Sequence, residues 1–568
     1  MKTIVVSNRG AYNRDVNQNI VETPGGIGAI FRAIPKTFRK ANGINSNGDE
    51  IVIISSPGPG DTSSFNHGSV TSDFPELFFK GESADFVLEK AKRFIDISVW
   101  NGTHGLQQDL LDADEATNAW VHWLIYSTVM AAKVTELAEE GDNVLVQDWI
   151  CCLVPGILSG NISKDYISEQ ITLCPQIEEP EREKLLSTLN IAFENLQSKA
   201  EVELNVDTFI HTCVVEPEDF IHHVDGPLKN QRPHRSRVDV ILNSLGSANI
   251  QVHTNTWKQN LESLFEKREI DKQGIVSVNP AGISPKRFKV LEVFNLLRIK
   301  KVRSLVQDQS QGTKLVFMSG RADPSKNIPA MLEEYLQYIK KNPSENVKMV
   351  LQVHATREGE KQYDLEWLRV QELVTKINNF KPGSCVHFDD NNHSRALLFA
   401  SISDVFCAPS LADGLGLTVL EAIKSYIPRF SFGVLSTGAI LSSRELLELK
   451  QFSVLKKFTN YASNSSDRPV VIIGSLGLGA WQVLDELGFN EESGVFSEIK
   501  RLSQAIDLVK RGRGIQANDP KLKIDGKDWN DIAWFNKLKE GVSKLTLNKA
   551  KKIESNMTVD SRPSQLLS

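Results

Sequence analysis

The sequence predicts an α/β fold with two facing, doubly wound parallel sheets and a cleft between them. Short runs of β-branched and other apolar residues recur along the chain and alternate with segments of helical period. Nearly every position in these runs is apolar, which is typical of strands covered on both faces. A proline-containing turn at 285–303 divides the runs into two series. Ligands of such sheets bind beyond the carboxyl ends of the strands.

The apolar runs place the individual strands and helices. The first series of strands is expected at 3–7, 51–55, 143–147, 208–212, 250–254 and 275–278. The second series is expected at 314–319, 347–353, 384–388, 404–408 and 469–473. Apolar residues at helical spacing predict helices at 115–139 and 328–341, and a charged helix at 180–200.

The domain boundaries follow from the proline-containing turn. We expect an N-terminal domain at 1–288, with a polar insertion at about 159–206. A C-terminal domain is expected at 289–527, with a second insertion at 442–467. The segment 528–547 has a helical pattern, so we expect a helix that crosses back over the hinge. The polar residues 548–568 are expected to form a disordered tail.

The composition narrows the classes of function. The 568 residues carry a formal charge of −6, so there is no basic footprint for nucleic acid. No apolar run reaches the roughly 18 residues that a membrane helix needs. The first apolar stretch ends at 7–9, which predicts a strand rather than a signal peptide. The six cysteines lack CxxC spacing and are expected to be buried thiols. We therefore expect a soluble, cytoplasmic protein.

A turn of mixed charge follows the strand expected at 314–319. It contains Arg321, Asp323 and Lys326, directly after a glycine at 320. The glycine allows a ligand to approach the backbone, and the arginine and lysine can converge on a diphosphate. The alternative is a solvated turn in which Arg321 pairs with Asp323.

A glycine-rich turn follows the strand expected at 404–408. It begins at Asp413, continues through Leu415, Gly416 and Leu417, and leads to Glu421. Backbone N–H groups at the start of a helix bind anions, and Glu421 can accept hydrogen bonds from ribose hydroxyls. The alternative is a capped helix with an exposed acid.

The remaining motifs are weak. Glycines at 25, 26 and 28 precede a helical stretch at 29–38, but such loops are common. Asp112 and Asp114 have the DxD spacing of a metal site, yet they lie in a helical region, so we reject a metal site there. The segment 474–479 resembles a dinucleotide fingerprint only loosely, and no ribose-binding acid follows at the expected distance.

In their order and spacing, several segments resemble the trehalose-6-phosphate synthase family of retaining GT-B glycosyltransferases. These segments are VVSNRG, GGIGAI, VSVNPAGISPKRF, GRADPSKN, QVHATREGEKQY and ADGLGLTVLEAI, and they run through most of the chain. The resemblance implies two Rossmann-like domains. The N-terminal domain would bind the acceptor, and the C-terminal domain would bind a nucleotide sugar.

On the donor side, the resemblance implies a role for each matched position. The donor-binding residues would be Gly26, Arg321, Lys326, Leu415, Gly416, Leu417 and Glu421. The catalytic residues would be Arg321, Lys326, Asp413 and His211. The two cations would bind the diphosphate, the glutamate the ribose, and the glycine at 26 would approach the donor phosphates. The aspartate, the amides of 415–417 and the histidine would lie near the transferred sugar.

On the acceptor side, Arg9 and Arg357 match the two arginines that hold an acceptor phosphate. Trp100 resembles a tryptophan that lines the acceptor pocket, and Asp148 an acidic residue near the acceptor. His253 also fits the family pattern, but we favour a structural role for it.

The departures from the family pattern lie on the acceptor side. Family members usually have histidines flanking the position of Asp148, where this chain has Gln147 and Ile150. A proline-rich run after the position of His211 is replaced by 212–215, and we cannot place the family's acceptor-binding tyrosine. The donor side looks retained, whereas the identity of the acceptor stays open.

The resemblance therefore implies a retaining glycosyltransferase of trehalose biosynthesis, with UDP-glucose as donor and a phosphorylated sugar as acceptor. Neither a cofactor nor a metal is expected, and a homo-oligomer stays open. One alternative is an enzyme of the same class with a different donor and acceptor. It would be a pseudo-glycosyltransferase of the validoxylamine type with a cyclitol acceptor, a glucosylglycerol-phosphate synthase or another sugar-phosphate synthase of specialised metabolism. Another is a non-catalytic regulator that binds a sugar phosphate, supported only by the altered residues around Asp148. The nucleotide base and the roles of the insertions do not follow from the sequence.

Overall fold

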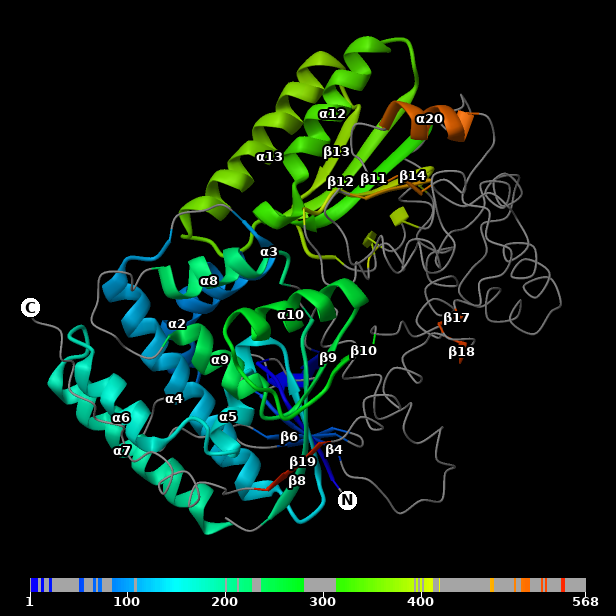
Figure 1. Ribbon diagram of the computed structural model, residues 1–568. Helices are drawn as coiled ribbons and strands as arrows, with labels where there is room; N and C mark the ends of the chain where they lie inside the picture. The colour runs from blue at the N-terminus through cyan, green and yellow to red at the C-terminus, as the bar shows by residue number, and fades with distance from the viewer. Residues whose placement is uncertain are drawn as a thin grey trace, which may run out of the picture. The chain divides into compact units, whose positions relative to one another are not determined.

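The computed structural model describes part of the chain. The described residues are 2–8, 12–14, 20–22, 51–55, 65–67, 70–73, 84–106, 110–199, 202–211, 214–226, 236–279, 313–392, 395–396, 399–400, 403–411, 418, 470–473, 495–496, 502–510, 523–524, 527–528 and 543–546. The chain forms two compact units (Figure 1). Unit 1 comprises Met1–Asn279 and Phe535–Ser568, and unit 2 comprises Pro280–Trp534. The boundaries expected from the sequence were 288/289 and 527/528. Each unit has its own sheet.

Unit 1 contains a nine-stranded sheet in the order β10-β9-β8-β7-β1-β4-β6-β5, with β19 paired to β8. Its strands are β1 (Thr3–Val6), β4 (Ile51–Ile54), β5 (Phe65–His67), β6 (Val70–Asp73), β7 (Asn143–Gln147), β8 (Glu203–Phe209), β9 (Asn249–Val252), β10 (Val276–Val278) and β19 (Ser543–Thr546). Neighbours are parallel, except that β5 is antiparallel to β6 and β19 to β8. Every position of β1, β4 and β7 is buried, as expected for strands covered on both faces. A separate hairpin pairs β2 (Tyr12–Arg14) with β3 (Ile20–Glu22).

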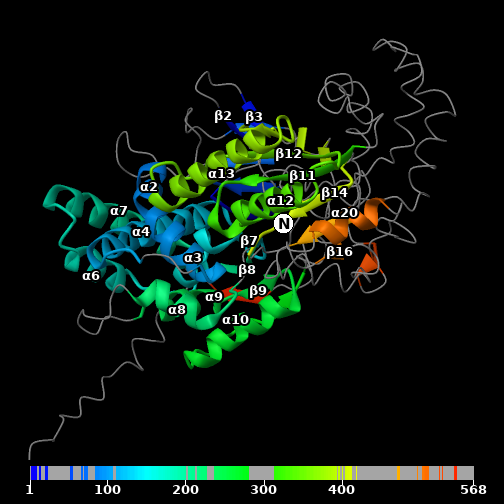
Figure 2. The ribbon, with the colours of Figure 1, turned by 90° about the horizontal axis from the view of Figure 1, so that it is seen from above.

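Helices pack around this sheet and on one another. They are α2 (Ala84–Arg93), the π-helical η1 (Phe94–Val99), α3 (Trp100–His104), α4 (Ala113–Leu137), η2 (Trp149–Cys151), α5 (Val154–Leu158), α6 (Lys164–Leu173), α7 (Glu179–Ser198), α8 (Pro217–Asp225), α9 (Arg237–Leu245) and α10 (Asn255–Lys267). Most of α4 is buried because α2 and α7 both pack on it (Figure 1 and Figure 2). The expected insertion at 159–206 therefore contains a helix pair, α6 and α7, that covers α4.

Strand β8 begins earlier than expected. The sequence predicted a strand at 208–212, whereas β8 runs from Glu203 to Phe209. Its first half alternates half-buried polar positions, Glu203 and Asn205, with buried apolar ones, and this alternation hid it from a search for continuous apolar runs.

The C-terminal segment adds a strand to unit 1. We expected a helix at 528–547, but residues 543–546 form β19, antiparallel to β8, with Ser543 opposite Val206 and Thr546 opposite Glu203. Strand β9 pairs only with the second half of β8, from Asp207 on. The first half of β8 thus offers backbone groups that β19 can pair, which favours an extended conformation over a helix. The tail at 548–568 lies outside the described residues.

Unit 2 contains a six-stranded parallel sheet in the order β13-β12-β11-β14-β15-β16. Its strands are β11 (Lys314–Arg321), β12 (Val347–His354), β13 (Cys385–Phe388), β14 (Val405–Ala408), β15 (Val470–Ile473) and β16 (Val495–Phe496). Its helices are η5 (Pro324–Lys326), α12 (Ile328–Lys341), α13 (Lys361–Phe380) and α20 (Leu502–Lys510). A short antiparallel pair joins β17 (Lys523–Ile524) and β18 (Lys527–Asp528). The predicted α/β class with parallel sheets is confirmed in both units.

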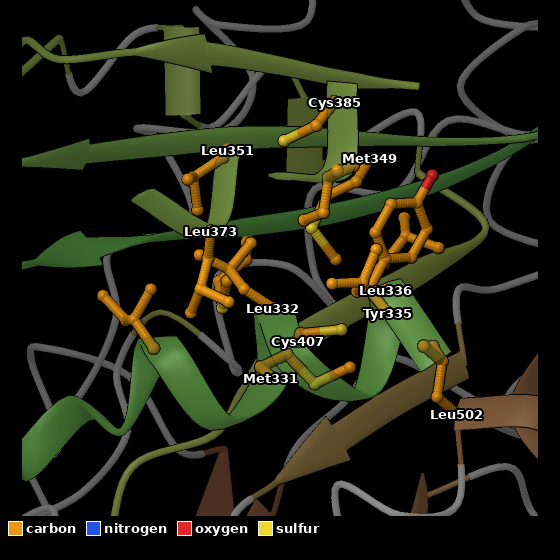
Figure 3. Packing of buried hydrophobic residues seen from close by; sticks show 14 of the residues in the cluster. Met331, Leu332, Tyr335, Leu336, Met349, Leu351, Leu373, Cys385, Cys407 and Leu502 are labelled. Atoms are coloured by element: carbon orange, nitrogen blue, oxygen red, sulfur yellow. The ribbon is translucent and has the colours of Figure 1, made fainter. Parts of the chain in front are cut away.

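The core of unit 2 lies between one face of its sheet and its helices. Alternate residues of β11, β12 and β14, among them Met349, Leu351 and Cys407, meet Met331 and Leu332 of α12 (Figure 3). Helices α13 and α20 contribute to the same buried cluster. On the other face, the ring of Phe317 packs against those of Phe399 and Phe406, with centroids 5.6 and 5.9 Å away. The sheet is therefore apolar on both faces, which explains its continuous apolar runs.

The structure also tests what the sequence predicted about cysteines and membrane helices. Five of the six cysteines are free and buried, as expected, and Cys213 lies outside the described residues. Within the described ranges, no helix combines the length and the low polarity that crossing a bilayer requires.

The close approach of α5 to α9 gives a testable prediction about unit 1. The N–H of Gly156 donates to Ser244 Oγ over 2.7 Å, and a Cβ added at Gly156 would lie 2.6 Å from Ser244 Cβ. Gly156→Ala is therefore expected to lower the free energy of unfolding by about 1–3 kcal/mol through overpacking. Urea unfolding measures this. In the double variant with Ser244→Gly the two losses should not add, and strict additivity would contradict the predicted clash.

Candidate functional site

The carboxyl ends of three neighbouring strands meet at one edge of unit 2. Strand β11 ends at Arg321, and β12 ends at His354, three residues before Arg357. After β14, the N–H of Leu411 donates to the carbonyl of Ser325 over 2.8 Å. Because these strands are parallel neighbours, the charged turn at 319–327 and Leu411, which follows β14, lie side by side. Arg321 and Lys326 of the charged turn thus lie at the same edge of the sheet as the segment that carries Arg357.

A buried carboxylate lies at the centre of the charged turn. The Asp323 side chain is 0% exposed. Its Oδ1 accepts hydrogen bonds from the Ser325 N–H (3.0 Å) and hydroxyl (2.7 Å). Its Oδ2 lies 3.5 Å from Arg321 Nη2 and 3.3 Å from Arg357 Nη1. The alternative of a solvated turn is therefore wrong in its essential part: Arg321 does face Asp323, but the carboxylate is buried and two arginines share it.

The charge state of Asp323 follows from its neighbours. Burial by itself would raise the pKa of this carboxyl, but the positive charges of Arg321, Arg357 and Lys326 and the hydrogen bond from Ser325 hold it below its ordinary value. The carboxylate is therefore ionised, and it keeps three cations close together. Lys326 also belongs to this turn through its backbone, whose N–H donates to the Asp323 carbonyl over 2.8 Å.

Arg357 is held in an unusual conformation. Its φ is 49°, in the left-handed region that residues other than glycine rarely adopt. Its Nη1 donates to the hydroxyl of Tyr363, and the guanidinium carbon lies 4.8 Å from the centre of that ring. Tyr363 is a buried residue of the first turn of α13. Backbone strain of this kind persists where the surroundings over-determine a functional residue.

The candidate residues of unit 1 follow strands β7 and β8. Asp148 comes directly after β7 and has a φ of 62°, a second left-handed residue that is not glycine. Its N–H donates to the carbonyl of Phe209 over 2.7 Å, and its Oδ1 accepts from the backbone N–H of His211 over 3.2 Å. The structure thus brings Asp148 and His211 into direct contact at the carboxyl ends of neighbouring strands.

The His211 imidazole is held in its neutral form. Burial lowers its pKa, although the nearby charge of Asp148 opposes this. Its Nε2 lies 3.0 Å from Gln147 Oε1, so the ring donates its proton to the glutamine. The ring also packs against Phe209 and His253, with centroids 4.6 and 5.5 Å away. His253 is 3% exposed, which fits the structural role that we favoured for it.

Trp100 lies on an element that contacts this region. It begins α3, directly after the π-helical η1, and its ring stacks on His104 with centroids 4.1 Å apart. The carbonyl of Thr103 accepts from the N–H of Val215, four residues after His211. Helix α8 packs on α3, and the ring of its Phe220 lies tilted against that of Trp149, with centroids 5.1 Å apart. The elements that carry Trp100, Asp148 and His211 therefore pack together.

Several predicted site residues lie outside the described residues. They are Arg9, Gly26, Asp413, Leu415, Gly416, Leu417 and Glu421. Their roles remain predictions from the sequence, as do the helix at 29–38 and the insertion at 442–467.

Comparisons with known proteins agree with these motifs. A family model described as Glycosyltransferase family 20 matches residues 251–444, which include the charged turn, Arg357 and the glycine-rich turn. The Alpha,alpha-trehalose-phosphate synthase [UDP-forming] of Encephalitozoon cuniculi is 21% identical over 340 residues. The chain is therefore similar to the trehalose-6-phosphate synthase family over the segment that the family model matches. The similarity to the Encephalitozoon member covers 58% of this chain and 62% of that protein.

Further proteins of this family extend the comparison. The Alpha,alpha-trehalose-phosphate synthase [UDP-forming] 1 of Aspergillus niger is 29% identical over 168 residues, 28% of this chain and 32% of that protein. The chain thus spans less than two thirds of the length of these curated family members. A crystal structure of the Burkholderia xenovorans enzyme in complex with glucose-6-phosphate has a TM-score of 0.62 at 13% identity, covering 95% of this chain and 99% of that one.

A second solved structure of the family has the same fold. It is described as trehalose-6-phosphate from E. coli bound with UDP-2-fluoro glucose, and it has a TM-score of 0.58 at 13% identity. The similarity covers 98% of each chain. At such low identity the two structures show that this chain shares their fold, and nothing further.

Sequence reasoning missed three side chains of these sites. Gln147 was seen only as a departure from the family, although it is the hydrogen-bond partner of His211. Tyr363 lies inside the quoted segment QVHATREGEKQY, six residues after Arg357, and this spacing was the available signal. Glu366 follows on α13 and gave no signal, because only its partial burial in the folded chain makes it unusual.

Glu366 provides a pH-dependent test of the geometry around Asp323. Burial raises the pKa of Glu366 to about 7, the charge of Arg369 opposes this and that of Asp323 adds to it. The ordinary pKa of a glutamate is 4.5. Between this pH and a pH of about 7, Glu366 is therefore protonated in the folded chain but ionised in the unfolded chain. The free energy of unfolding should fall as the pH rises through this window.

The variant Glu366→Gln is expected to lack this contribution. It should be more stable than the unmodified protein above the window and no more stable below it. Urea unfolding at a pH on each side of the window measures the difference. Glu372→Gln, an exposed carboxylate on the same helix that pairs with Lys376, is the control and should not reproduce the effect. An unchanged pH slope in Glu366→Gln would show that partial burial does not raise the pKa of Glu366.

Proposed function

We propose that the protein is a retaining glycosyltransferase that moves glucose from UDP-glucose to a phosphorylated sugar, with trehalose 6-phosphate as the product. The observation that carries this proposal is the gathering of Arg321, Lys326 and Arg357 around Asp323 at the carboxyl edge of the unit 2 sheet. These are the residues that the family resemblance assigns to the donor diphosphate and the acceptor phosphate. Support comes from the UDP-forming names of the curated relatives and from the glucose-6-phosphate complex of the Burkholderia enzyme.

The chemistry of the donor site follows from charge. Cleavage of the sugar–phosphate bond places negative charge on the departing UDP and positive charge on the sugar carbon. Arg321 and Lys326 are cations of the charged turn, and they would stabilise the negative charge that develops on the leaving diphosphate. We expect no metal ion to be needed for this, so that turnover should survive EDTA.

The acceptor would be delivered from the face of the sugar that the UDP leaves. Its hydroxyl oxygen then bonds to the sugar carbon, and its proton passes to the departing phosphate, so no dedicated carboxylate base is required. The neutral His211 and Asp148, on the unit 1 sheet, would orient the transferred sugar and the acceptor. His211 can do this at neutral pH as a hydrogen-bonding group, because its lowered pKa keeps it uncharged.

One observation favours a second candidate for the acceptor. Gln147 occupies the position of a family histidine and binds His211, so the surroundings of the acceptor differ from the family pattern. A different sugar phosphate or a cyclitol phosphate as acceptor is therefore the second candidate function.

A substrate panel distinguishes the two candidates. UDP-, GDP- and ADP-glucose would each be offered with glucose 6-phosphate, glycerol 3-phosphate and a cyclitol phosphate, with and without EDTA. Clear preference for UDP-glucose with glucose 6-phosphate supports the first proposal. Preference for another pair replaces it with the second, and the absence of turnover with every pair would contradict both.

A further inference from the structure

One oxygen of Asp323 faces two arginines that come from different strands. Arg321 ends β11 and Arg357 follows β12, the next strand in the sheet. Oδ2 lies 3.5 Å from the first guanidinium and 3.3 Å from the second. The other oxygen, Oδ1, is fixed within its own turn by the N–H and hydroxyl of Ser325. The carboxylate therefore has one anchored oxygen and one shared oxygen.

The two arginines are held to different degrees. Arg321 is 37% exposed, and its contact with Asp323 is at the long end of an ion pair. Arg357 is 15% exposed and is further held by the hydroxyl and the ring of Tyr363. An anion that binds Arg321 competes only with its long contact to Asp323. The side chain of Arg357 is instead held in place by Asp323 and Tyr363 together.

We propose that Asp323 is a positioning residue that couples the binding of the donor diphosphate at Arg321 to the binding of the acceptor phosphate at Arg357. This inference rests on the proposed function, which assigns one phosphate to each arginine. When the diphosphate draws Arg321 away, the shared oxygen interacts with Arg357 alone and fixes its guanidinium for the second phosphate. Coupling of this kind is reciprocal, so each ligand should tighten the binding of the other.

The coupling can be measured by titration calorimetry on the full chain. The probes are UDP and glucose 6-phosphate, each titrated with and without a saturating amount of the other. In the unmodified protein, UDP should lower the Kd of glucose 6-phosphate by about fivefold or more, the lower end of usual coupling factors. In Asp323→Asn, which keeps the shape but removes the charge, this factor should fall to about one.

Two further variants separate positioning from a merely structural role. Glu333→Gln removes a carboxylate from an exposed ion pair with Arg369 in the same unit and should keep the full coupling factor. In an Arg357→Gln background, adding Asp323→Asn should not weaken glucose 6-phosphate binding further, because Asp323 acts through Arg357. Equal losses with and without Arg357 would indicate a structural role and overturn the proposal.

A folding control keeps the test decisive. If Asp323→Asn does not fold, Ser325→Ala replaces it, because this variant loses only the 2.7 Å anchor of Oδ1 and keeps the charge. It should reduce the coupling factor while both ligands still bind. An unchanged factor would overturn the proposal, as would the absence of coupling in the unmodified protein.

The outcome is distinguishable from a failure of the proposed function, since binding requires no turnover. Coupling that depends on Asp323 in a protein that transfers no glucose would contradict the proposed function and support the positioning role. Transfer with coupling unchanged in Asp323→Asn would contradict only the positioning role. A protein that binds neither UDP nor glucose 6-phosphate contradicts both.

Discussion

Replacing Arg321 by glutamine is expected to lower kcat by about a hundred- to a thousand-fold, the usual cost of removing one fixed donor that stabilises developing negative charge. Arg321 ends β11 and faces the site where the diphosphate is proposed to leave. Its positive charge would act most strongly when the sugar–phosphate bond breaks, so the loss should appear in kcat more than in the KM of the donor.

The fold should tolerate this change. Arg321 is partly exposed, and Asp323 keeps its contacts with Arg357 and Ser325 in the variant. Arg369→Gln is a matched control, because Arg369 is an exposed arginine of the same unit that pairs with Glu333. Initial rates at saturating substrates test the prediction. A kcat within a few-fold of the unmodified enzyme would remove Arg321 from the catalytic machinery.

Replacing both Arg9 and Arg357 by glutamine is expected to cause a large loss in the use of a phosphorylated acceptor. A hydrogen bond to a charged group contributes about 1.5–3 kcal/mol, so losing two should lower kcat/KM for glucose 6-phosphate by roughly a hundred- to ten-thousand-fold. The contribution of Arg357 rests on its fixed geometry over Tyr363. That of Arg9 rests on the family motif in the sequence.

The specificity of this loss is the informative readout. The double variant should lose its preference for glucose 6-phosphate over unphosphorylated glucose, because the remaining site no longer recognises the phosphate. Its affinity for UDP should remain, since Arg321 and Lys326 are unchanged. Unchanged turnover with glucose 6-phosphate in the double variant would contradict the assignment of both arginines.

The sequence predicted those parts of the fold whose signal is local. Strand β7 and helix α12 were placed at their observed bounds, because a continuous apolar run and a helical spacing of apolar residues report burial directly. The first half of β8 and the whole of β19 were missed. The first half of β8 pairs with β7 and β19, and β19 pairs with β8, so their extended conformation depends on partners far away in the chain, which no local pattern reveals.

The candidate site shows the same division between local and tertiary information. Arg321 and Lys326 were found because their spacing follows a recognisable strand. The burial of Asp323 and its sharing between two arginines could not be found, because an aspartate in a polar turn is exposed by default. Only the neighbouring strand brings Arg357 to it. Likewise, the importance of Gln147 follows only from its hydrogen bond with His211, which comes after a neighbouring strand.

The most direct test of the proposed function is the release of UDP from UDP-glucose, measured with and without glucose 6-phosphate and followed by NMR of the product. We predict release that depends on glucose 6-phosphate and yields an α,α-linked disaccharide phosphate. Release that is independent of the acceptor, or a product with another linkage, would contradict the account.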